Sequence, residues 1–520
     1  MFGSHATDQE LFDQYRQEVL DGPELMYVGC LLSRAAQKFP AVTALICQDE
    51  SITYQDLYRR ACAVSKMLHA HGIKPKDRVL VMVNNSIEFY VAYYGVMQAG
   101  AVVAPLNVFL REKELAHIIK DSNPALIIAS SELSELFQKT ELPLPPLLTE
   151  TALTTQASDQ EVTAFKTTQL PRDEMAVLLY TSGTTGFPKG VMLSSNNIIT
   201  NVLQGAARFR PQAHERIFAV LPLFHSFAQN TCVWAPFVFG YTVIIVPKIE
   251  RRTILKGLEH KPTVFLGVPA LFGLMCLLKS ASLDSVTMFA SGGDAMPDKI
   301  RVLFSLIYRR RIGAGYGLTE TSPVVAACLE DEIVRVDTVG RPLVGVTVSF
   351  RDEQGNERPQ GEVGELWVKG PNVMLGYYNA DEANKNVFSD GWFKTGDLAY
   401  MDAQGRIVIA GRIKDLIAHK GFKIYPPEVE NVIMLYPNVL RVGVIGMKDN
   451  LMGEVPVAYV QVRQAEEGIE QKLKELCDKN LASYKIPRYF ICSVDELPLT
   501  STGKVDKKVL RQRVHDDIKA

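Results

Sequence analysis

Short apolar segments alternate with amphipathic ones along the first part of the chain. Residues 78–83 (RVLVMV) form a continuously apolar, β-prone run, which is typical of a strand that is buried on both faces. The segments on either side of it repeat apolar residues at helical spacing. This alternation predicts a largely parallel sheet with helices on both faces. We predict helices at 53–71, 86–98 and 112–120 and strands at 78–83, 101–105 and 125–129.

The pattern changes further along the chain. Strands predicted at 217–220, 243–246, 264–268 and 288–291 again alternate with helices. From 339 to 378, short alternating segments separated by glycine turns predict a small antiparallel β unit. The C-terminal segment carries strand and helix patterns of its own. The sequence therefore predicts an α/β protein with a large N-terminal domain of parallel-rich sheets flanked by helices, a small β unit, and a smaller α/β C-terminal domain.

The composition excludes several classes of protein. A chain of 520 residues exceeds one typical domain, and 47% hydrophobic with 22% charged residues is ordinary for a globular protein. A net charge of -2 gives no reason to expect nucleic-acid binding. The 8 cysteines show no CxxC spacing, which indicates reduced thiols in a cytoplasmic protein and neither a disulfide framework nor a zinc site.

Targeting and membrane-spanning segments are not indicated. The N-terminus is acidic and polar, unlike a signal peptide. The most apolar region, 217–246, is interrupted by Pro222, His225 and Pro236, so we predict no transmembrane segment. Peripheral membrane contact and the choice between a monomer and a homodimer stay open at this stage.

Glycines, hydroxyls and a lysine gather in one loop, YTSGTTGFPKG at 180–190. Its glycines can take positive φ and let backbone N–H groups approach a bulky anion, while its hydroxyls and lysine add donors and a positive charge. The spacing does not match GxxxxGK[ST], and 191–193 is predicted to be a second strand, so no helix N-terminus follows the loop directly. The residues predicted to bind a polyphosphate are Thr181, Ser182, Gly183, Thr184, Thr185, Gly186 and Lys189.

A basic, glycine-bearing strip, TSTGKVDKKVLRQR, occupies residues 500–513. Runs of charge usually face solvent. Composition alone therefore predicts a solvated tail here.

Five motifs follow one another in order along the chain. They are YTSGTTGFPKG (180–190), YGLTETSP (316–323), TGD (395–397), GRIKDLI (411–417) and STGK (501–504). Each is modestly specific, but five in one order are hard to obtain by accident. By these motifs, residues 25–515 resemble the adenylate-forming superfamily of acyl-CoA synthetases, luciferases and peptide-synthetase adenylation domains.

The resemblance implies a ligase that uses ATP, Mg²⁺ and coenzyme A. In such enzymes a carboxylate attacks the α-phosphate of ATP, pyrophosphate leaves, and the acyl adenylate passes its acyl group to the thiol of CoA with release of AMP. Because an anion must approach a triphosphate, the site has to supply cations and donors. The resemblance also implies an N-terminal adenylation domain at 1–411 and a mobile C-terminal domain at 412–520 that rotates about a hinge near Lys414.

The motifs imply roles for single residues of the N-terminal domain. The glycine loop would hold the β- and γ-phosphates, Thr319 would contact the α-phosphate, and Glu320 would hold Mg²⁺. The nucleotide base would lie in a pocket formed by Tyr316, Gly317, Gly293 and Asp294.

Further roles follow towards the C-terminus. Asp397 would accept hydrogen bonds from the ribose, and Arg412 would reach the ribose or a phosphate. Lys504 would enter the site as the adenylation catalyst, which exempts this lysine alone from the solvated-tail prediction. After rotation, Lys420 and Gly421 would flank the channel for the pantetheine arm of CoA.

The nature of the acid is addressed by the segment around His225, which resembles the family's aromatic or histidine gate beside the acyl site. Amino-acid-activating relatives carry an aspartate in this motif, and this chain has no acid nearby, which argues against an amino acid substrate. The stretches implied to line the acyl tunnel are apolar or small apart from Gln229 and Asn230, and each buried CH₂ contributes about 0.8 kcal/mol. They favour a medium- or long-chain fatty acid. These stretches are 227–234, 265–271, 291–293, 313–316 and 324–328.

Three alternatives stay open. A fatty-acyl-AMP ligase would load an acyl carrier protein instead of CoA, but the insertion that hinders rotation in such relatives has no obvious counterpart here. An aryl-acid:CoA ligase would take a hydroxylated aromatic acid. A non-catalytic acyl- or adenylate-binding protein would be expected to have lost a catalytic group, whereas all of these are present: Lys189, Glu320, Asp397, Arg412 and Lys504.

Overall fold

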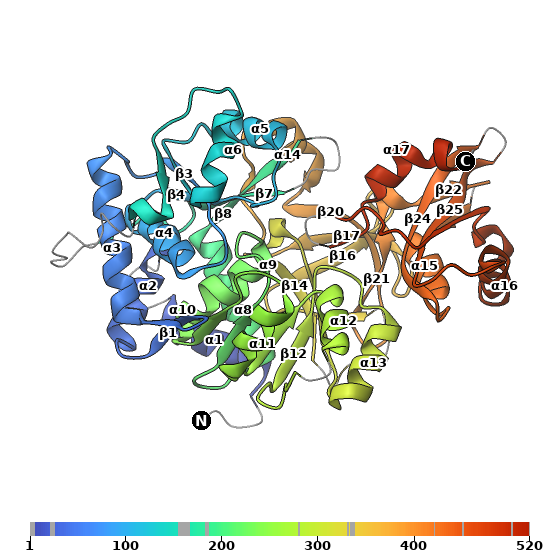
Figure 1. Ribbon diagram of the computed structural model, residues 1–520, viewed down its shortest axis with the longest axis horizontal. Helices are drawn as coiled ribbons and strands as arrows, with labels where there is room; N and C mark the ends of the chain where they lie inside the picture. Colours follow the sequence, from blue (N-terminus) through green and yellow to red (C-terminus); the bar gives the residue numbers. More distant parts are fainter. Residues whose placement is uncertain are drawn as a thin grey trace.

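A large N-terminal part and a smaller C-terminal part make up the molecule (Figure 1). The computed structural model describes residues 6–20, 27–153, 167–181, 187–278, 281–329, 332, 338–420, 422–449, 452–500 and 503–518. Two large sheets lie in the N-terminal part, and a third sheet lies in the C-terminal part. The predicted α/β class and the division into a large and a small domain are confirmed.

The first sheet contains the strands predicted in the first part of the chain. Its central strands β7, β4, β3, β5 and β6 pair in parallel, and β7 pairs antiparallel with β8. The strand order is β18 (Gly376–Tyr377), β8 (Lys189–Ser194), β7 (Met175–Thr181), β4 (Val102–Pro105), β3 (Arg78–Met82), β5 (Leu126–Ala129) and β6 (Leu147–Thr149). The predicted helices that precede β3, β4 and β5 in the chain are α3 (Tyr54–Ala70), α4 (Ile87–Gln98) and α5 (Glu112–Ser122).

The second sheet begins parallel and ends antiparallel. Its parallel strands are β1 (Thr43–Cys47), β9 (Arg216–Ala219), β10 (Thr242–Ile245), β11 (Val264–Gly267), β12 (Met288–Ser291) and β13 (Gly313–Gly317). The antiparallel continuation holds β14 (Val324–Cys328), β15 (Thr338–Pro342), β16 (Thr347–Arg351), β17 (Gly364–Lys369), β20 (Trp392–Met401) and β21 (Ile407–Arg412). The predicted β unit at 339–378 is thus antiparallel: β15, β16 and β17 extend the second sheet, and β18 at its end pairs with β8 of the first sheet.

The two large sheets share one hydrophobic core. This core contains Val79 and Val103 from the first sheet and Ile217 and Val243 from the second, together with the buried faces of α4 and α8 (Ser195–Phe209). Helix α8 begins after β8 because the Ser194 hydroxyl accepts from the backbone N–H of the third helical residue, in a capping box. The remaining secondary elements of the N-terminal part include α1 (Asp8–Val19), α2 (Leu31–Lys38), β2 (Glu50–Thr53), α6 (Ser134–Gln138), α9 (Ser226–Ala228), α10 (Ala235–Phe239), α11 (Arg251–Glu259), α12 (Pro269–Leu277), α13 (Asp298–Tyr308), α14 (Asp381–Val387) and β19 (Phe388–Ser389).

The C-terminal part has its own sheet and its own cores. The hydrophobic clusters there contain only residues from Ile417 onwards. A single turn of 3₁₀ helix, Ile413–Asp415, joins β21 to this sheet. The elements are β22 (Ile417–His419), β23 (Phe422–Ile424), α15 (Pro426–Met434), β24 (Val439–Asp449), β25 (Gly453–Val462), α16 (Ile469–Asn480), β26 (Tyr489–Ser493) and α17 (Lys507–Asp517).

The prediction of a solvated tail at 500–513 is wrong. Most of the strip after Lys504 is helix α17, and its Leu510 and Val514 are buried against the C-terminal sheet. Lys507 pairs with Glu430 at 2.6 Å, and Arg511 pairs with Asp415 at 2.7 Å. Two apolar residues four apart are enough to hold one face of a helix on a core. Because charged residues surround Leu510 and Val514 in the sequence, their helical spacing did not predict a buried face.

Two sequence-based predictions concern membranes and thiols. Among the residues that the structure describes, no helix combines the length and apolar character needed to cross a membrane. None of the 8 cysteines, all of which lie within the described ranges, forms a disulfide.

Candidate active site

The hairpin of β7 and β8 holds both ends of the glycine loop. Thr181 pairs with Lys189, and Tyr180 pairs with Gly190, so Lys189 opens β8 beside the loop. A Cβ on Gly190 would lie 2.9 Å from the Leu178 side chain and 3.2 Å from the Tyr180 ring, so close packing requires glycine there. The loop residues outside the described ranges, whose phosphate contacts stay predictions, are Ser182, Gly183, Thr184, Thr185 and Gly186.

Helix α5 contacts the residues on both sides of the glycine loop. The Tyr180 hydroxyl donates to Asp121 Oδ2 at 2.6 Å on the strand that enters the loop. On the side that leaves it, the ring of Phe187 stacks on His117 with centroids 4.7 Å apart, and His117 Nε2 lies 3.1 Å from the Pro188 carbonyl oxygen. Both ends of the loop are therefore fixed to one helix.

Tyr377 joins the loop lysine to the predicted magnesium ligand. Strand β18 adds Tyr377 to the edge of β8, opposite Val191. The Lys189 ammonium lies 5.2 Å from the centroid of the Tyr377 ring, and the Tyr377 hydroxyl donates to Glu320 Oε1 at 2.7 Å. Burial raises the pKa of Tyr377 and that of Glu320, and the Tyr377 hydrogen bond partly offsets the shift at Glu320. Sequence reasoning missed Tyr377, because no spacing between residues 189, 320 and 377 signals their contact.

The donor set around Glu320 fits a magnesium ion shared with a substrate. Within the described ranges, no group of three or more His, Cys, Asp and Glu side chains could form a protein-only metal site. Glu320 offers one carboxylate, of which Oε1 already accepts from Tyr377. Mg²⁺ is commonly held by one or two carboxylates together with substrate phosphates and water. The residues present therefore fit that ion.

Asp397 connects the predicted adenine and ribose contacts. Its Oδ2 accepts from the Tyr316 hydroxyl at 2.6 Å, and its Oδ1 lies 3.0 Å from Arg412 Nε. Asp397 and Arg412 face each other across β20 and β21. Burial raises the pKa of Tyr316, with a further contribution from Asp397, so this phenol stays a donor. Three residues that lie far apart in the sequence thus form one fixed group.

Two glycines shape the predicted nucleotide pocket. Gly293 has a φ of +82°, a conformation that favours glycine. A Cβ on Gly317 would lie only 1.9 Å from the Pro323 carbonyl oxygen, so no other residue fits without moving the backbone. Asp294 follows Gly293 and accepts from the backbone N–H of Ala295.

The predicted gate and α-phosphate residues lie together. The hydroxyls of Ser226 and Thr319 are 3.1 Å apart. His225 begins α9, and its Nδ1 accepts from the Phe227 backbone N–H at 3.3 Å. A Cβ on Gly292 would lie 3.4 Å from the Phe227 ring. These contacts bring the segment 291–294 (SGGD), the segment around His225 and the Thr319 turn to one place.

Lys504 reaches the same place from the C-terminal part. A backbone hairpin presents it, since Thr500 N–H donates to the Lys504 carbonyl at 2.7 Å and Gly503 has a φ of +81°. Burial lowers the pKa of Lys504, and the nearby carboxylate of Asp294 opposes the shift. Asp397 and Arg412 also act on this ammonium, and the pKa of Glu320 responds to the same two groups. The structure therefore gathers the predicted catalyst and nucleotide ligands into one charged cluster.

Replacement of His225 by glutamine is expected to remove an acid-sensitive contribution to stability. Burial, aided by Lys504, lowers the pKa of His225 from 6.5 to about 4. Between these pH values the unfolded chain takes up a proton that the folded protein does not, so the wild type loses stability as the pH falls from 6.5 to 4. The loss is up to about 3 kcal/mol.

Thermal unfolding midpoints of both proteins at pH 7.5 and pH 5 provide the measurement. The unfolding midpoint of the wild type is expected to fall more between pH 7.5 and pH 5 than that of His225→Gln. An equal shift in the two proteins would show that His225 is not held neutral by its surroundings.

Two groups of predicted residues are not brought to this cluster. Lys420 is exposed on the turn from β22 to β23 and donates its backbone N–H to the Met452 carbonyl, while Gly421 lies outside the described residues. Their roles at the CoA channel stay predictions. Of the implied acyl lining, Phe265 and Leu271 are buried in a hydrophobic core, so the lining of an acyl tunnel by these stretches also stays a prediction.

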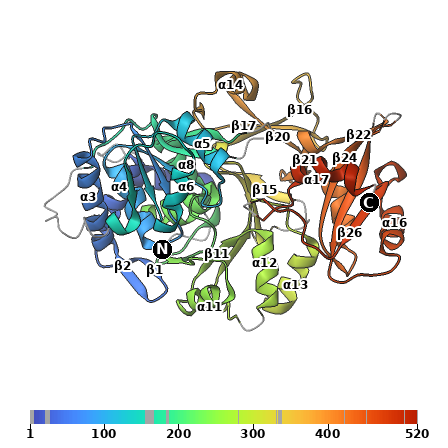
Figure 2. The same ribbon diagram turned by 45° about the horizontal axis from the view of Figure 1, so that its top comes forward.

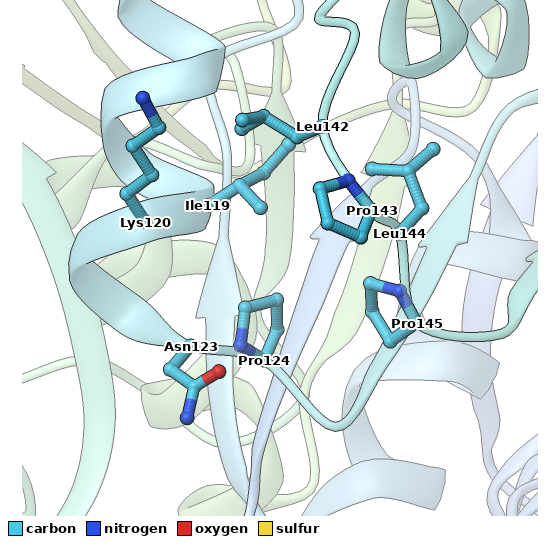
Figure 3. Close-up of a pocket in the computed structure, with 8 residues that line it drawn as sticks. All are labelled: Ile119, Lys120, Asn123, Pro124, Leu142, Pro143, Leu144 and Pro145. Atoms are coloured by element: carbon cyan, nitrogen blue, oxygen red, sulfur yellow. The ribbon is translucent and has the colours of Figure 1, made fainter.

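A separate surface groove lies on the other side of helix α5 from the loop contacts. Figure 3 shows Ile119, Lys120, Asn123 and Pro124 facing the segment 142–145, which carries two prolines. None of the residues predicted for nucleotide, acid or CoA binding lines this groove.

Known proteins resemble this chain over most of its length. A family model described as AMP-binding enzyme matches residues 32–378, and one described as AMP-binding enzyme C-terminal domain matches residues 428–504. A long-chain-fatty-acid–CoA ligase of Bacillus subtilis (strain 168) is 32% identical in an alignment 529 positions long, which covers 94% of this chain and 94% of the relative. A feruloyl-CoA synthase of an Amycolatopsis species is 33% identical over 487 residues, covering 92% of this chain and 97% of the relative.

A solved structure agrees over the same span. ATP-bound MatB from Rhodopseudomonas palustris has a TM-score of 0.87 to this chain and is 31% identical, covering 95% of this chain and 100% of that chain. The agreement extends over both the N-terminal and the C-terminal parts.

Proposed function

The chain belongs to the AMP-binding enzyme family, within the adenylate-forming superfamily, and is an ATP-dependent acid–CoA ligase that forms AMP. We propose that the acid it activates is a medium- or long-chain fatty acid. The proposal is supported by the apolar character of the stretches implied to line the acyl site and by the similarity to a long-chain-fatty-acid–CoA ligase. The similarity to a feruloyl-CoA synthase keeps an aryl acid as the second candidate.

One observation carries the assignment of the first step to this cluster. Lys504, from the C-terminal part, is half-buried, and the charges of Asp294, Asp397 and Arg412 of the nucleotide site act on its ammonium. This arrangement suits adenylation, because the ammonium can stand between an incoming carboxylate and the α-phosphate and offset their repulsion. We assign Lys504 as the adenylation catalyst on this ground.

The other residues hold ATP in place for attack. Lys189 and the glycine loop would bind the β- and γ-phosphates, Thr319 would contact the α-phosphate, and Asp397 would accept from the ribose hydroxyls. The expelled pyrophosphate would then stay against the loop, so the leaving group is held by a different set of donors from the one that assists attack. When bound at Glu320, Mg²⁺ would supply positive charge that offsets the charge of the phosphates.

The second step requires a different surface at the acyl adenylate. We propose that residues 412–520 rotate as a unit about Lys414, taking Lys504 away and bringing Lys420 and Gly421 towards the site. The single 3₁₀ turn at Ile413–Asp415 is the covalent connection between two separately formed cores. Few backbone angles need to change in such a connection.

A panel of carboxylic acids tests the substrate class. AMP release is measured with fatty acids of increasing length, ferulic acid and a dicarboxylic acid, each with and without CoA. Release that needs both CoA and a medium or long fatty acid supports the proposal. Preference for ferulic acid would establish the aryl-acid alternative, acyl adenylate that accumulates without transfer to CoA would indicate a ligase for a carrier protein, and no turnover with any acid would indicate a binding protein.

Replacement of Tyr377 by phenylalanine tests the link between Lys189 and Glu320. The ring under Lys189 remains, but Glu320 loses its hydroxyl donor. A hydrogen bond to a charged group contributes about 1.5–3 kcal/mol, so the apparent affinity for MgATP is expected to fall by roughly tenfold or more. Calorimetric titration with MgATP in the absence of acid measures binding without turnover.

Tyr378→Phe is the matched control, since this neighbouring ring packs into a hydrophobic cluster on the side of the first sheet. It is expected to bind MgATP as the wild type does. Equal weakening in the two variants would mean that Tyr377 supports the strand and does not position Glu320.

A further inference from the structure

Helices α12 and α13 expose a cluster of aliphatic side chains at one corner of the molecule. Figures 1 and 2 show the two helices side by side at the lower edge of the N-terminal part. Their C-terminal ends meet, because the Tyr308 hydroxyl donates to the Met275 carbonyl at 2.7 Å. Leu277 is 75% exposed at the end of α12, and Leu306 is 74% exposed near the end of α13.

The exposed face of the second half of α13 is mostly aliphatic. Val302 is 54% exposed and Leu303 is 41% exposed, and Leu306 lies one turn further on. The opposite face of the helix packs against the protein: Phe304 is fully buried, and Ile300 packs against the same core. A surface helix normally turns polar residues towards solvent. A single exposed leucine is common on protein surfaces, but a group of neighbouring exposed apolar side chains indicates a binding surface.

Three arginines border this cluster. Arg309, Arg310 and Arg311 follow α13 directly and are all exposed. None of them forms an ion pair with a residue in the described part of the chain. The acids on either side of them in the sequence already have partners: Asp298 pairs with Arg301, and Glu320 accepts from the Tyr377 hydroxyl. We call Leu277, Val302, Leu303, Leu306 and residues 309–311 the α12–α13 tip.

We propose that the α12–α13 tip docks on the surface of a membrane that contains anionic lipids. Aliphatic side chains can enter the boundary between head groups and acyl chains, while arginines contact the lipid phosphates. Each basic side chain near an anionic surface strengthens binding by roughly fivefold. The tip combines both elements on two adjacent helices. The proposal is independent of which acid the enzyme activates.

Charge and composition favour this occupant over a second copy of the chain. In a symmetric dimer built on the tip, the same patch would face itself, so one run of arginines would oppose the other. The exposed apolar side chains of the tip also include no aromatic ring, although aromatic residues are enriched at the centres of protein–protein interfaces. An anionic lipid surface complements the positive charge of the three arginines and does not need a complementary shape.

Flotation of the full chain with lipid vesicles tests the proposal. Vesicles of phosphatidylcholine alone are compared with vesicles that also contain phosphatidylglycerol, at low and high salt. Binding is expected only to the anionic vesicles and is expected to weaken with salt, because exposed charges are screened. Absence of binding to anionic vesicles would overturn the proposal.

Variants then locate the contact. Leu277→Ser combined with Leu306→Ser, and separately Arg309→Gln, Arg310→Gln and Arg311→Gln combined, are each expected to weaken vesicle binding about tenfold or more. Val494→Ser is the matched control, since Val494 is 52% exposed in the C-terminal part, and it is expected to bind as the wild type does. Unchanged thermal unfolding midpoints check that the variants fold.

Two results would contradict the assignment. Vesicle binding that both tip variants retain would place the membrane contact elsewhere. Concentration-dependent self-association in the absence of lipid, abolished by the leucine substitutions, would identify the tip as an interface between copies of this chain.

Discussion

Replacing Lys504 with alanine is expected to slow adenylation by roughly 10²- to 10³-fold, the scale for loss of one preorganised charged donor. The ammonium lies in the charged cluster with Asp294, Asp397 and Arg412, where it would offset the repulsion between the incoming carboxylate and the α-phosphate. The thioester step should be largely spared, because Lys504 leaves the site if the C-terminal domain rotates. Acid-dependent exchange of pyrophosphate into ATP measures the first step, and CoA ester formation from supplied acyl adenylate measures the second.

Lys508→Ala is the matched control for this change. Lys508 lies four residues further on and is exposed, so both steps should keep the wild-type rate. If Lys504→Ala slowed both steps equally, the residue would have a general structural role and its assignment as the adenylation catalyst would be lost.

Replacing Lys414 with proline is expected to have the opposite effect on the two steps. Lys414 lies in the middle of the 3₁₀ turn Ile413–Asp415, whose φ angles are close to the value that proline imposes. The present arrangement of the two parts should therefore be kept, and pyrophosphate exchange should fall only a few-fold. Rotation would require a new backbone conformation at this residue, so CoA ester formation from acyl adenylate should fall by roughly 10²-fold or more, the scale of losing a properly assembled site.

Lys414→Ala separates the backbone from the side chain. Burial lowers the pKa of the Lys414 ammonium, with a contribution from Arg412, so removal of this charge alone is the proper comparison. It should support both steps. A proline variant that formed CoA esters at the normal rate would move the hinge to another residue or exclude rotation.

Local patterns were sufficient for most of the architecture. Buried parallel strands such as β3 and β4 are continuously apolar, and the helices between them repeat every 3.6 residues, so their positions were predictable to within two residues. The glycine loop between two strands was recognisable because β8 keeps its apolar run up to the cap at Ser194. These features depend on neighbours in the sequence.

The parts that escaped prediction depend on distant neighbours. Tyr377 becomes important only because β18 pairs with β8 and so places its hydroxyl against Glu320. The burial of α17 depends on a partner sheet that begins about ninety residues earlier, and its two apolar residues were outweighed by the charges around them. The motifs identified Asp397, Tyr316 and Arg412 singly, but the hydrogen bonds that join them belong to the folded chain.

The pairing of β18 with β8 also bears on the order of events during synthesis. Residues 376–377 form strand β18, which pairs with β8 next to the glycine loop. They leave the ribosome long after Lys189 does. Non-local pairs of this kind form late, since a long stretch of chain must be closed first. Because Glu320 and Lys189 are joined through Tyr377, a nascent chain that stops short of this strand would contain the loop but not its assembled phosphate site. Nucleotide would then stabilise only chains whose N-terminal domain is complete, and ATP would act as a selective ligand for the finished domain during folding.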